Sequence, residues 1–397
     1  MFNVGDRAGW ERMVTMKRNP IHVRGQRRRI HQYLGSANAL SSFYTQQDIE
    51  ARRFLLRALQ SPERLPHGRD PLVDLADTST EQFGKAHTPG TWLVDSFPLL
   101  KYLPPWVPGA GFQTTAREWR STLDKLTGKP YAFVQQQIKN RTFQPSYVSK
   151  QLTQAEPDLS PEEETEIKWS AATLYGAGAD TTVSALSSFF LAMALFPAVQ
   201  TKAQEELDRA VGTSLPTTED RANLPYTNAV IKEVLRWNPV TPLGVAHACT
   251  KEDVYEGYRI SRDATIIPNI WAFLHDPKVY SDPMTFNPER FLDTETHHAE
   301  NDPHNLAFGF GRRICPGRGF ADSTIFLTVV RSLQAFRIGK LVKDGREIEP
   351  AVDYLPGVIS HPKAYEISMT PRSKEHELFI RSIEIEHPWE KGDIVIV

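Results

Sequence analysis

One cysteine of this chain lies in a loop whose residue types suit the binding of a metal. Cys315 is part of the segment FGFGRRICPG, residues 308–317, among closely spaced glycines and two arginines. The glycines let the backbone turn tightly and let a flat partner approach, and the arginines add fixed positive charge. Residues 319–333 have the apolar spacing of a helix, so Cys315 would lie at a helix N-terminus, where amides and the dipole favour a thiolate. A thiolate held in this way is suited to ligate a metal.

A lone cysteine in a glycine-rich loop is more commonly a small buried apolar residue. Here five residues occur together at fixed offsets, which argues for a function: Phe308, Gly311, Arg313, Cys315 and Gly317. On these residues the segment resembles the haem-binding loop of the cytochrome P-450 family, the haem-thiolate monooxygenases. The resemblance implies that Cys315 is the axial ligand of the haem iron and that Phe308, Gly311 and Arg313 contact the cofactor.

A second group of candidate residues interrupts a long apolar helix. The segment AGADTT, residues 177–182, brings small residues, an acid and hydroxyls into a helix predicted over 162–196. Gly178 weakens the local helix and Thr181 can bond back to a carbonyl, so we expect a kink or widened turn with room for dioxygen and water. Asp180 and Thr181 would then form a proton relay. Alone, an acid followed by threonine is more often a local cap or a solvated face; beside the cysteine loop we interpret the pair as catalytic.

Two further motifs predict a buried ionic network. Glu233 and Arg236 are three residues apart on one predicted helix and can pair, although such pairs are common and individually weak. The segment PERF, residues 288–291, supplies a second arginine, Arg290, from a proline-rich loop. Because buried charges persist as networks, we expect these three residues to lock the loop that carries the cysteine.

Three cations are candidates to hold the haem propionates that the resemblance implies. Arginine forms charge-assisted forks with carboxylates and histidine can donate to one, which indicates Arg313 and His247. His247 also fits an ordinary core residue, because it follows the apolar run PLGV. Arg27 is the third candidate, since the family has a tryptophan-x-x-x-arginine pair in one helix, and here Val23 stands at the tryptophan position.

The elements expected around these residues are mostly helices. Helical periodicity is clearest at 45–59, 115–126, 131–140, 162–196, 198–211 and 224–237. Strand patterns follow at 254–260, with a turn at Glu256-Gly257, at 264–267 and at 364–369. Prolines are frequent in 98–108 and 268–303, which predicts long ordered loops. The fold class is therefore mainly α with a small β part.

Composition narrows the function classes. The 397 residues contain no linker, repeat or low-complexity run, so we predict one domain over 1–397, with a charged C-terminal tail at 372–397. Basic and acidic residues number 46 and 48, which does not suggest nucleic-acid binding, and the basic run 24–29 is most simply a solvated face. Two cysteines provide no disulfide framework and indicate a reducing setting. The most apolar stretch, 183–199, is typical of a buried helix, not of a membrane span.

All four motifs occur in the order typical of the family, and the resemblance extends from about Trp10 to the C-terminus. It is closest to fungal microsomal members, on the segments 303–308 and 356–362. Such proteins normally begin with a membrane-anchor helix and the first strands of a small sheet. We expect this chain to be a cytochrome P-450 fold that lacks both, with a second shortening near 67–70.

The resemblance also implies a cofactor, partners and a location. The cofactor would be haem b, with Cys315 favouring O–O cleavage while Asp180 and Thr181 deliver protons. Electrons would come from an NADPH-dependent cytochrome P-450 reductase at the cytoplasmic face of the endoplasmic reticulum membrane, where full-length members are found. The substrate would be an apolar small molecule, in fungal secondary or xenobiotic metabolism. By analogy the pocket would be lined by residues that could otherwise be ordinary core: Leu174, Ala177, Gly178, Leu243, Val245 and Val358.

Two other kinds of protein remain open. The first is a truncated, non-catalytic haem-binding protein or a haem-free remnant, which the expected N-terminal shortening favours. The second is a haem-thiolate isomerase or dehydratase that needs no reductase. The acid-threonine pair at Asp180 and Thr181 argues against dedicated non-catalytic use and against the second class, whose members usually lose that pair.

Overall fold

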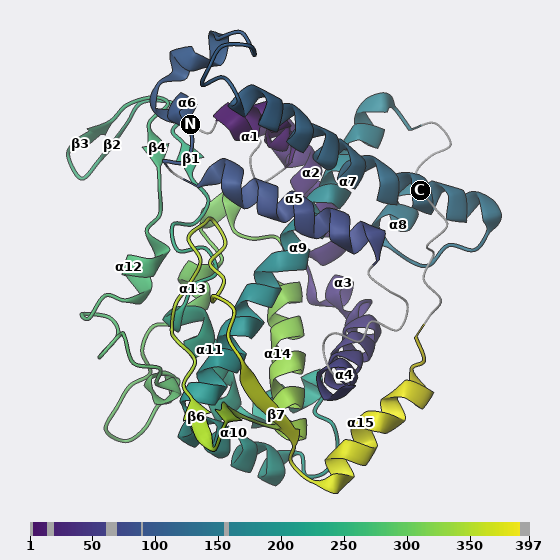
Figure 1. The fold of residues 1–397 in the computed structure, drawn as a ribbon, viewed down its shortest axis with the longest axis vertical. Coiled ribbons are helices and arrows are strands. Elements are labelled where there is room, and N and C mark those ends of the chain that lie inside the picture. Colours follow the sequence, from purple (N-terminus) through teal and green to yellow (C-terminus); the bar gives the residue numbers. More distant parts are fainter. Residues whose placement is uncertain (1–2, 14–19, 61–69, 89, 155–158, 390–397) are drawn as a thin grey trace.

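The computed structural model describes residues 3–13, 20–60, 70–88, 90–154 and 159–389, and this part of the chain is mainly helical, as predicted (Figure 1). Its first half contains the helices α1 (Asn3–Ala8), α2 (Pro20–Leu34), α3 (Ala37–Ser41), α4 (Tyr44–Gln60), α5 (Pro71–His87), α6 (Leu93–Ser96), α7 (Phe112–Asn140) and α8 (Tyr147–Gln154). The second half contains α9 (Pro161–Leu195), α10 (Pro197–Ala210), α11 (Pro225–Trp237), α12 (Ile270–Leu274), α13 (His304–Ala307), α14 (Arg318–Ala335) and α15 (Lys374–Glu386).

Short 3-10 turns join several of these helices. They are η1 (Trp10–Arg12), η2 (Pro98–Tyr102), η3 (Thr218–Asn223), η4 (Pro288–Phe291) and η5 (Gly311–Arg313). Two of them, η2 and η4, lie in the proline-rich stretches predicted to be loops, and η5 lies in the cysteine loop. The helices predicted at 45–59, 162–196, 198–211, 224–237 and 319–333 correspond to α4, α9, α10, α11 and α14.

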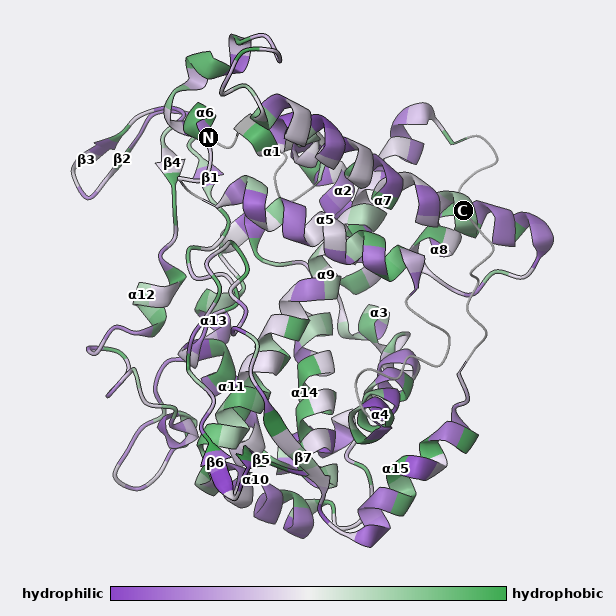
Figure 2. Cartoon of the chain, viewed as in Figure 1, coloured by the Kyte–Doolittle hydropathy of each residue, from purple (hydrophilic) through white to green (hydrophobic). Residues whose placement is uncertain are grey.

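The helix α9 is the central element of the core. It begins at a capping box, in which the Ser160 hydroxyl accepts from the Glu163 amide and the Glu163 carboxylate accepts from the Ser160 amide. Its C-terminal half packs on α14 and α11, and this contact buries large apolar side chains such as Phe189 and Phe326. Apolar residues gather along these helices in Figure 2. Each such side chain stabilises the fold by ~1.5–3 kcal/mol.

Among the described residues, α9 is the one helix long and apolar enough to cross a membrane by length and composition. Half of its most apolar window is buried inside the protein. This burial agrees with the prediction of a buried helix for the stretch 183–199.

One prediction about the helices was wrong, because 115–126 and 131–140 belong to a single helix, α7, with Pro130 inside it. Proline removes one backbone hydrogen bond and disfavours a helix by ~3 kcal/mol. The buried face nevertheless runs through the proline, from Leu123 and Leu126 to Tyr131. Packing of that face on neighbouring helices, including α1, α5 and α9, offsets the local penalty.

In the described part of the chain, the strands form three small antiparallel sheets. β2 (Asp253–Tyr255) and β3 (Tyr258–Ile260) form the predicted hairpin, with Glu256 and Gly257 at positive φ of 47° and 84°. β4 (Thr265–Ile266) pairs with β1 (His247–Ala248), and β5 (Phe336–Lys343) lies between β6 (Arg346–Ile348) and β7 (Ile367–Pro371). The sequence predicted a single small sheet from 254–260 and 264–267. The structure instead pairs Ile266 with His247, which no local pattern indicated.

The segment predicted as a charged C-terminal tail contains a helix. α15 carries many charged residues, but it buries Ile380 and Ile383 in the same core as Leu55 and Leu56 of α4. Residues 390–397 lie outside the described residues. So do residues 67–69, where a shortening was expected, while Asp70 caps α5 by accepting from the Leu72 amide.

Candidate active site

The cysteine loop has the tight turns that its glycines allow. Gly309 and Gly311 adopt positive φ angles of 76° and 53°, which side chains rarely tolerate. The Cys315 amide donates to the Phe308 carbonyl at 2.8 Å and closes the loop. Cys315 itself is exposed and lies three residues before the start of α14 at Arg318. The loop thus presents a thiol at the N-terminal end of a buried helix.

The electrostatics of this thiol differ from what the sequence suggested. Although Cys315 keeps contact with solvent, the protein packed around its thiol desolvates it and raises its pKa. The Gly317 and Arg318 amides and the charges of Arg27 and Arg318 act in the opposite direction. Burial is the stronger influence, so the protein alone does not favour the thiolate. A coordinating metal deprotonates a thiol outright, so a metal ion would supply the missing stabilisation of the anion.

The three cations proposed from the sequence gather around this loop. Arg27 of α2 donates to the Ile314 carbonyl at 2.8 Å. Burial lowers the pKa of Arg313, and the charge of Arg27 lowers it further. Burial also lowers the pKa of His247, and the charge of Arg313 adds to that effect. These like charges repel one another, so an anionic group placed among them would be stabilised. The three residues come from α2, η5 and β1, which are far apart in the chain.

The acid-threonine pair lies on α9, which stays α-helical through 176–182 without the widened turn that we expected. Thr181 donates its hydroxyl to the Ala177 carbonyl at 2.8 Å, the back-bond anticipated from the sequence. Asp180 faces a partner that the sequence did not indicate, since its Oδ1 lies 3.0 Å from His361 Nε2. Ala177 and Gly178 are exposed, and a Cβ added at Gly178 would meet no atom within 4 Å. This face of α9 therefore leaves space beside the pair.

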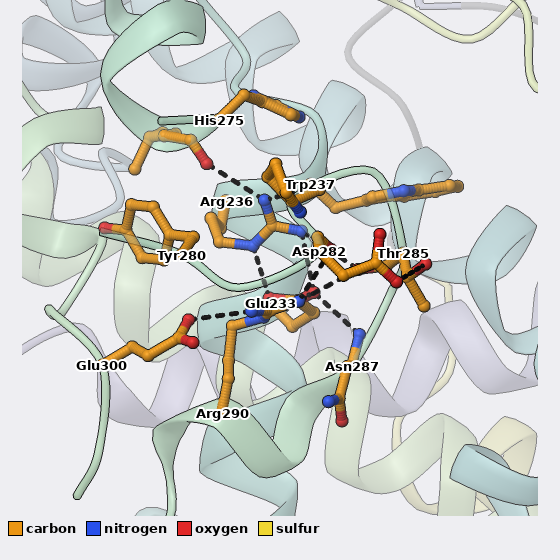
Figure 3. A network of polar contacts seen from close by, with 12 residues as sticks. Glu233, Arg236, Trp237, His275, Tyr280, Asp282, Thr285, Asn287, Arg290 and Glu300 are labelled. Atoms are coloured by element: carbon orange, nitrogen blue, oxygen red, sulfur yellow. Dashed lines mark hydrogen bonds and ion pairs between the residues drawn. The ribbon is translucent and has the colours of Figure 1, made fainter. Parts of the chain in front are cut away.

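The predicted ionic network is present and fully buried (Figure 3). Arg236 forms a two-pronged pair with Glu233, with distances of 2.7 and 2.9 Å, and Arg290 reaches Glu233 at 3.2 Å. Sequence reasoning missed a fourth member, Glu300, which pairs with Arg290 at 2.8 Å. Burial alone would raise the pKa of Glu300, but hydrogen bonds from Ser281 and Arg290 outweigh it and lower the pKa. Two carboxylates thus balance two guanidinium groups inside the protein.

The network ties α11 to the long loop that leads to Cys315. Arg236 donates to the carbonyls of Leu274 and Pro283, and Arg290 donates to the Ser281 carbonyl. The Glu300 amide donates to the Arg290 carbonyl at 2.7 Å, a few residues before α13 begins. The fixed path of this loop determines where the cysteine loop starts.

A second polar cluster supports Phe308 and was also missed. His304 lies between two carboxylates, 2.8 Å from Asp302 through Nδ1 and 3.1 Å from Asp322 through Nε2. Its ring stacks on Phe308 with centroids 5.8 Å apart. Burial would lower the pKa of His304, but the two carboxylates outweigh it and raise the pKa. Lys232 pairs with Asp302 and Arg221 with Asp322, so the cluster joins α11, η3 and α14 to the cysteine loop.

The residues proposed for a substrate pocket do not share one environment. Leu174 packs against Val23 and Ile30 of α2 and behaves as ordinary core. Leu243 is exposed, and Val245 and Val358 are half-buried. Gly244 between the first two adopts a φ of 55°, and a Cβ there would lie 2.6 Å from the Pro268 ring. The described contacts do not enclose all six residues in one cavity.

These features define a mainly helical protein that presents a cysteine thiol beside a cluster of cations, and comparisons with known proteins identify its family. The model described as Cytochrome P450 matches residues 70–369. The chain is 42% identical over 409 residues to O-methylsterigmatocystin oxidoreductase of Aspergillus flavus, covering 97% of this chain and 77% of that protein. It is 43% identical over 401 residues to cytochrome P450 monooxygenase 208 of Postia placenta, covering 96% and 78%.

A solved zebra fish cytochrome P450, determined with abiraterone, has the same fold. Its TM-score is 0.67, with 23% identity and coverage of 93% of this chain and 87% of that chain. The chain therefore belongs to the cytochrome P450 family and is a cytochrome P450 monooxygenase, with haem as its cofactor. The resemblance to fungal members drawn from residues 303–308 and 356–362 is confirmed.

The residues present fit a haem. An exposed thiol, two arginines, a histidine beside one of them and a glycine-bearing helix face suit a flat group that carries a metal and two carboxylates. The chemistry of the donors, one thiol sulfur and cationic nitrogens, agrees with the family.

The buried network makes a prediction about stability. Glu300→Gln removes one of its two negative charges while keeping the shape of the side chain, and it leaves Arg290 with a single carboxylate. We expect the free energy of unfolding to fall by about 2 kcal/mol. Urea unfolding measures this loss, and Glu289→Gln is the matched control, because Glu289 pairs with Lys202 in an exposed position of the same loop. Equal stability of the two variants would contradict the prediction.

The His304 cluster predicts a dependence of stability on pH. The pKa of His304 is raised above 6.5, so its contribution is fully present below pH 6.5 and is lost as pH rises through the folded pKa. Asp302 and Asp322 have pKa values lowered from 3.8, to about 2 for Asp322, so their contribution is lost only as pH falls further. The cluster therefore stabilises the fold most at pH values above those at which Asp302 and Asp322 take up protons and below those at which His304 loses its proton.

We expect the wild type to lose more stability than His304→Gln when the pH rises from 5.5 to 8.5. Urea unfolding midpoints at the two pH values measure the difference. His298→Gln, which changes a fully exposed histidine paired only with Asp293 among the described residues, should behave as the wild type. Parallel losses in all three proteins would show that His304 is not responsible.

Proposed function

We propose that this cytochrome P450 monooxygenase binds haem b through Cys315 and oxidises an apolar small molecule at carbon. Electrons come from an NADPH-dependent cytochrome P-450 reductase. The observation that carries the proposal is the exposed Cys315 thiol, which the glycine turns hold beside Arg27, Arg313 and His247. The related oxidoreductase of Aspergillus flavus supports a role in fungal secondary or xenobiotic metabolism.

Each residue of the site has a definite task. Cys315 would ligate the iron, Arg27, Arg313 and His247 would hold the propionates, and Phe308 would contact the cofactor from the cysteine loop. The bound haem supplies the activation of dioxygen. One oxygen atom of dioxygen would enter the substrate, and the other would be reduced to water by two electrons and two protons.

The protons reach the site along α9. The Thr181 hydroxyl donates to the Ala177 carbonyl, so its oxygen lone pairs are available to accept a hydrogen bond from water. Asp180, the adjacent residue, holds a carboxylate that can take a proton from solvent and pass it on. Exposed Ala177 and Gly178 leave room for the water that joins these groups.

Association with the cytoplasmic face of the endoplasmic reticulum membrane completes the proposal. Large apolar side chains of α6 and of the segment between α6 and α7 point to solvent. Their exposed fractions range from 62% to 82%, and they are Leu93, Phe97, Leu99, Tyr102 and Trp106. An exposed apolar patch of this kind marks an interaction surface. We expect the double substitution Leu99→Glu and Trp106→Glu to reduce cosedimentation with phosphatidylcholine vesicles by about tenfold. The control, Ile385→Glu on α15, changes an equally exposed apolar residue and should have no effect.

The function itself is tested by the carbon monoxide difference spectrum of the reduced, haem-supplied protein. We expect a thiolate-type Soret band in the wild type and in Cys249→Ala, and its loss in Cys315→Ala, because only Cys315 is positioned as the ligand. A band that survives in Cys315→Ala would refute the ligand assignment. A wild type that takes up no haem would favour the non-catalytic alternative.

A further inference from the structure

We propose that His361 is a positioning residue for proton delivery, which holds the Asp180 carboxylate in place on α9. The proposal deepens the proposed function and rests on it. Its basis is the contact between His361 Nε2 and Asp180 Oδ1 at 3.0 Å, which is an ion pair when the imidazole is protonated and which joins side chains that are 25% and 28% exposed. Among the described residues it is the one ion pair that Asp180 makes.

Several hydrogen bonds hold the backbone around His361 in place, and one of them comes from α9 itself. Ser184, one turn beyond Asp180 on α9, donates its hydroxyl to the Ser360 carbonyl at 2.6 Å, and both serines are buried. The Ser360 amide in turn donates to the Val240 carbonyl at 2.8 Å. The residue before His361 is therefore tied both to α9 and to the segment that follows α11.

The residues on the other side of His361 are held as well. The Leu355 amide donates to the His361 carbonyl at 2.7 Å, and Tyr354 bridges to Pro362. Further along, the Tyr365 hydroxyl donates to the Ser187 carbonyl of α9 at 2.6 Å. The imidazole is thus delivered to Asp180 by a preorganised loop, and little conformational freedom is lost when the pair forms.

This arrangement restrains the carboxylate where its orientation matters. Asp180 precedes Thr181, whose hydroxyl is already fixed to the Ala177 carbonyl. A carboxylate held by an imidazole on Oδ1 keeps its second oxygen, Oδ2, available for water, whereas an unrestrained aspartate would rotate between solvent and the site. His361 acts through Asp180 and does not itself touch the reacting atoms.

Other charges near the pair do not take over this task. On the same loop, Lys363 pairs with Asp353 at 2.5 Å, and both are exposed, so these two charges compensate each other. Tyr354 and Tyr365 pack against α9, and burial raises the pKa of each hydroxyl well above its ordinary value, so both stay neutral. The pair Lys363–Asp353 therefore provides a matched control on the same loop.

The contact is tested first, by a measurement that does not depend on turnover. Long-range proton–nitrogen NMR of the reduced carbon monoxide form reports the imidazole nitrogens of each histidine. We expect Asp180→Asn to shift the Nε2 resonance of His361 and Asp353→Asn to leave it unchanged. An unchanged resonance in Asp180→Asn would overturn the proposal. If the carbon monoxide band itself is missing, the proposed function fails, and the same spectrum on the haem-free protein still decides the contact.

The role is tested by substitution of His361 in the haem-loaded protein with excess NADPH-dependent reductase. His361→Gln keeps a hydrogen-bond donor but no charge, and His361→Arg keeps a cation. We expect His361→Gln to slow NADPH oxidation by about fivefold and to increase its solvent deuterium isotope effect, because proton delivery becomes limiting. His361→Arg should restore both quantities.

Lys363→Gln breaks the neighbouring ion pair and should leave both quantities at the wild-type level. An unchanged rate and isotope effect in His361→Gln would overturn the proposal. So would a failure of His361→Arg to restore them, or an equal effect of Lys363→Gln, since either result would indicate a general disturbance of the loop. A normal carbon monoxide band in each variant shows that haem binding is intact and separates these outcomes from a failure of the proposed function.

Discussion

The position of Cys315 depends on a buried ionic network. Glu233, Arg236 and Arg290 are buried, and Glu300 pairs with Arg290 from the edge of the network with its side chain 10% exposed. Two charges of each sign therefore meet where unpaired charges would be strongly destabilising. Their remaining donors bind carbonyls of the loop between α12 and α13, so the loop has one path that satisfies every charge. A cysteine loop that begins from this fixed path can hold its thiol in one place with only the short turn η5 as secondary structure of its own.

The rest of the site adds restraints to that starting point. The cluster around His304 anchors Phe308, and Arg27 holds the Ile314 carbonyl just before the cysteine. The cations that gather there repel one another, and burial disfavours the Cys315 thiolate. Both the repulsion among the cations and the cost of the Cys315 thiolate are unfavourable in the protein alone. Carboxylates among the cations would relieve the first, and an iron bound to the sulfur would relieve the second. The site is built for a group that brings its own charges.

Much of this could be predicted because its signals are local. The residue spacing around Cys315, the apolar periodicity of α9 and the turn at Glu256-Gly257 can each be recognised within one continuous segment of the sequence. Glu300, His304 and His361 could not be predicted, since each gains its role from a partner that the fold supplies and that no spacing rule connects. The continuous α7 was missed for a related reason, because the burial that offsets Pro130 comes from other helices.

The same distinction separates the two kinds of polar residue in the site. Cys315, Asp180 and Thr181 are the residues that we propose carry the chemistry, and their types follow from what the proposed reaction requires. Glu300, His304 and His361 supply position, and position can be supplied by any residue of suitable charge that the fold brings close. His361 is the clearest case, because the tie between Ser184 and Ser360 is independent of its side chain and would deliver another cation to the same place. We therefore propose that a positive charge at position 361, and not the imidazole ring as such, is what restrains Asp180.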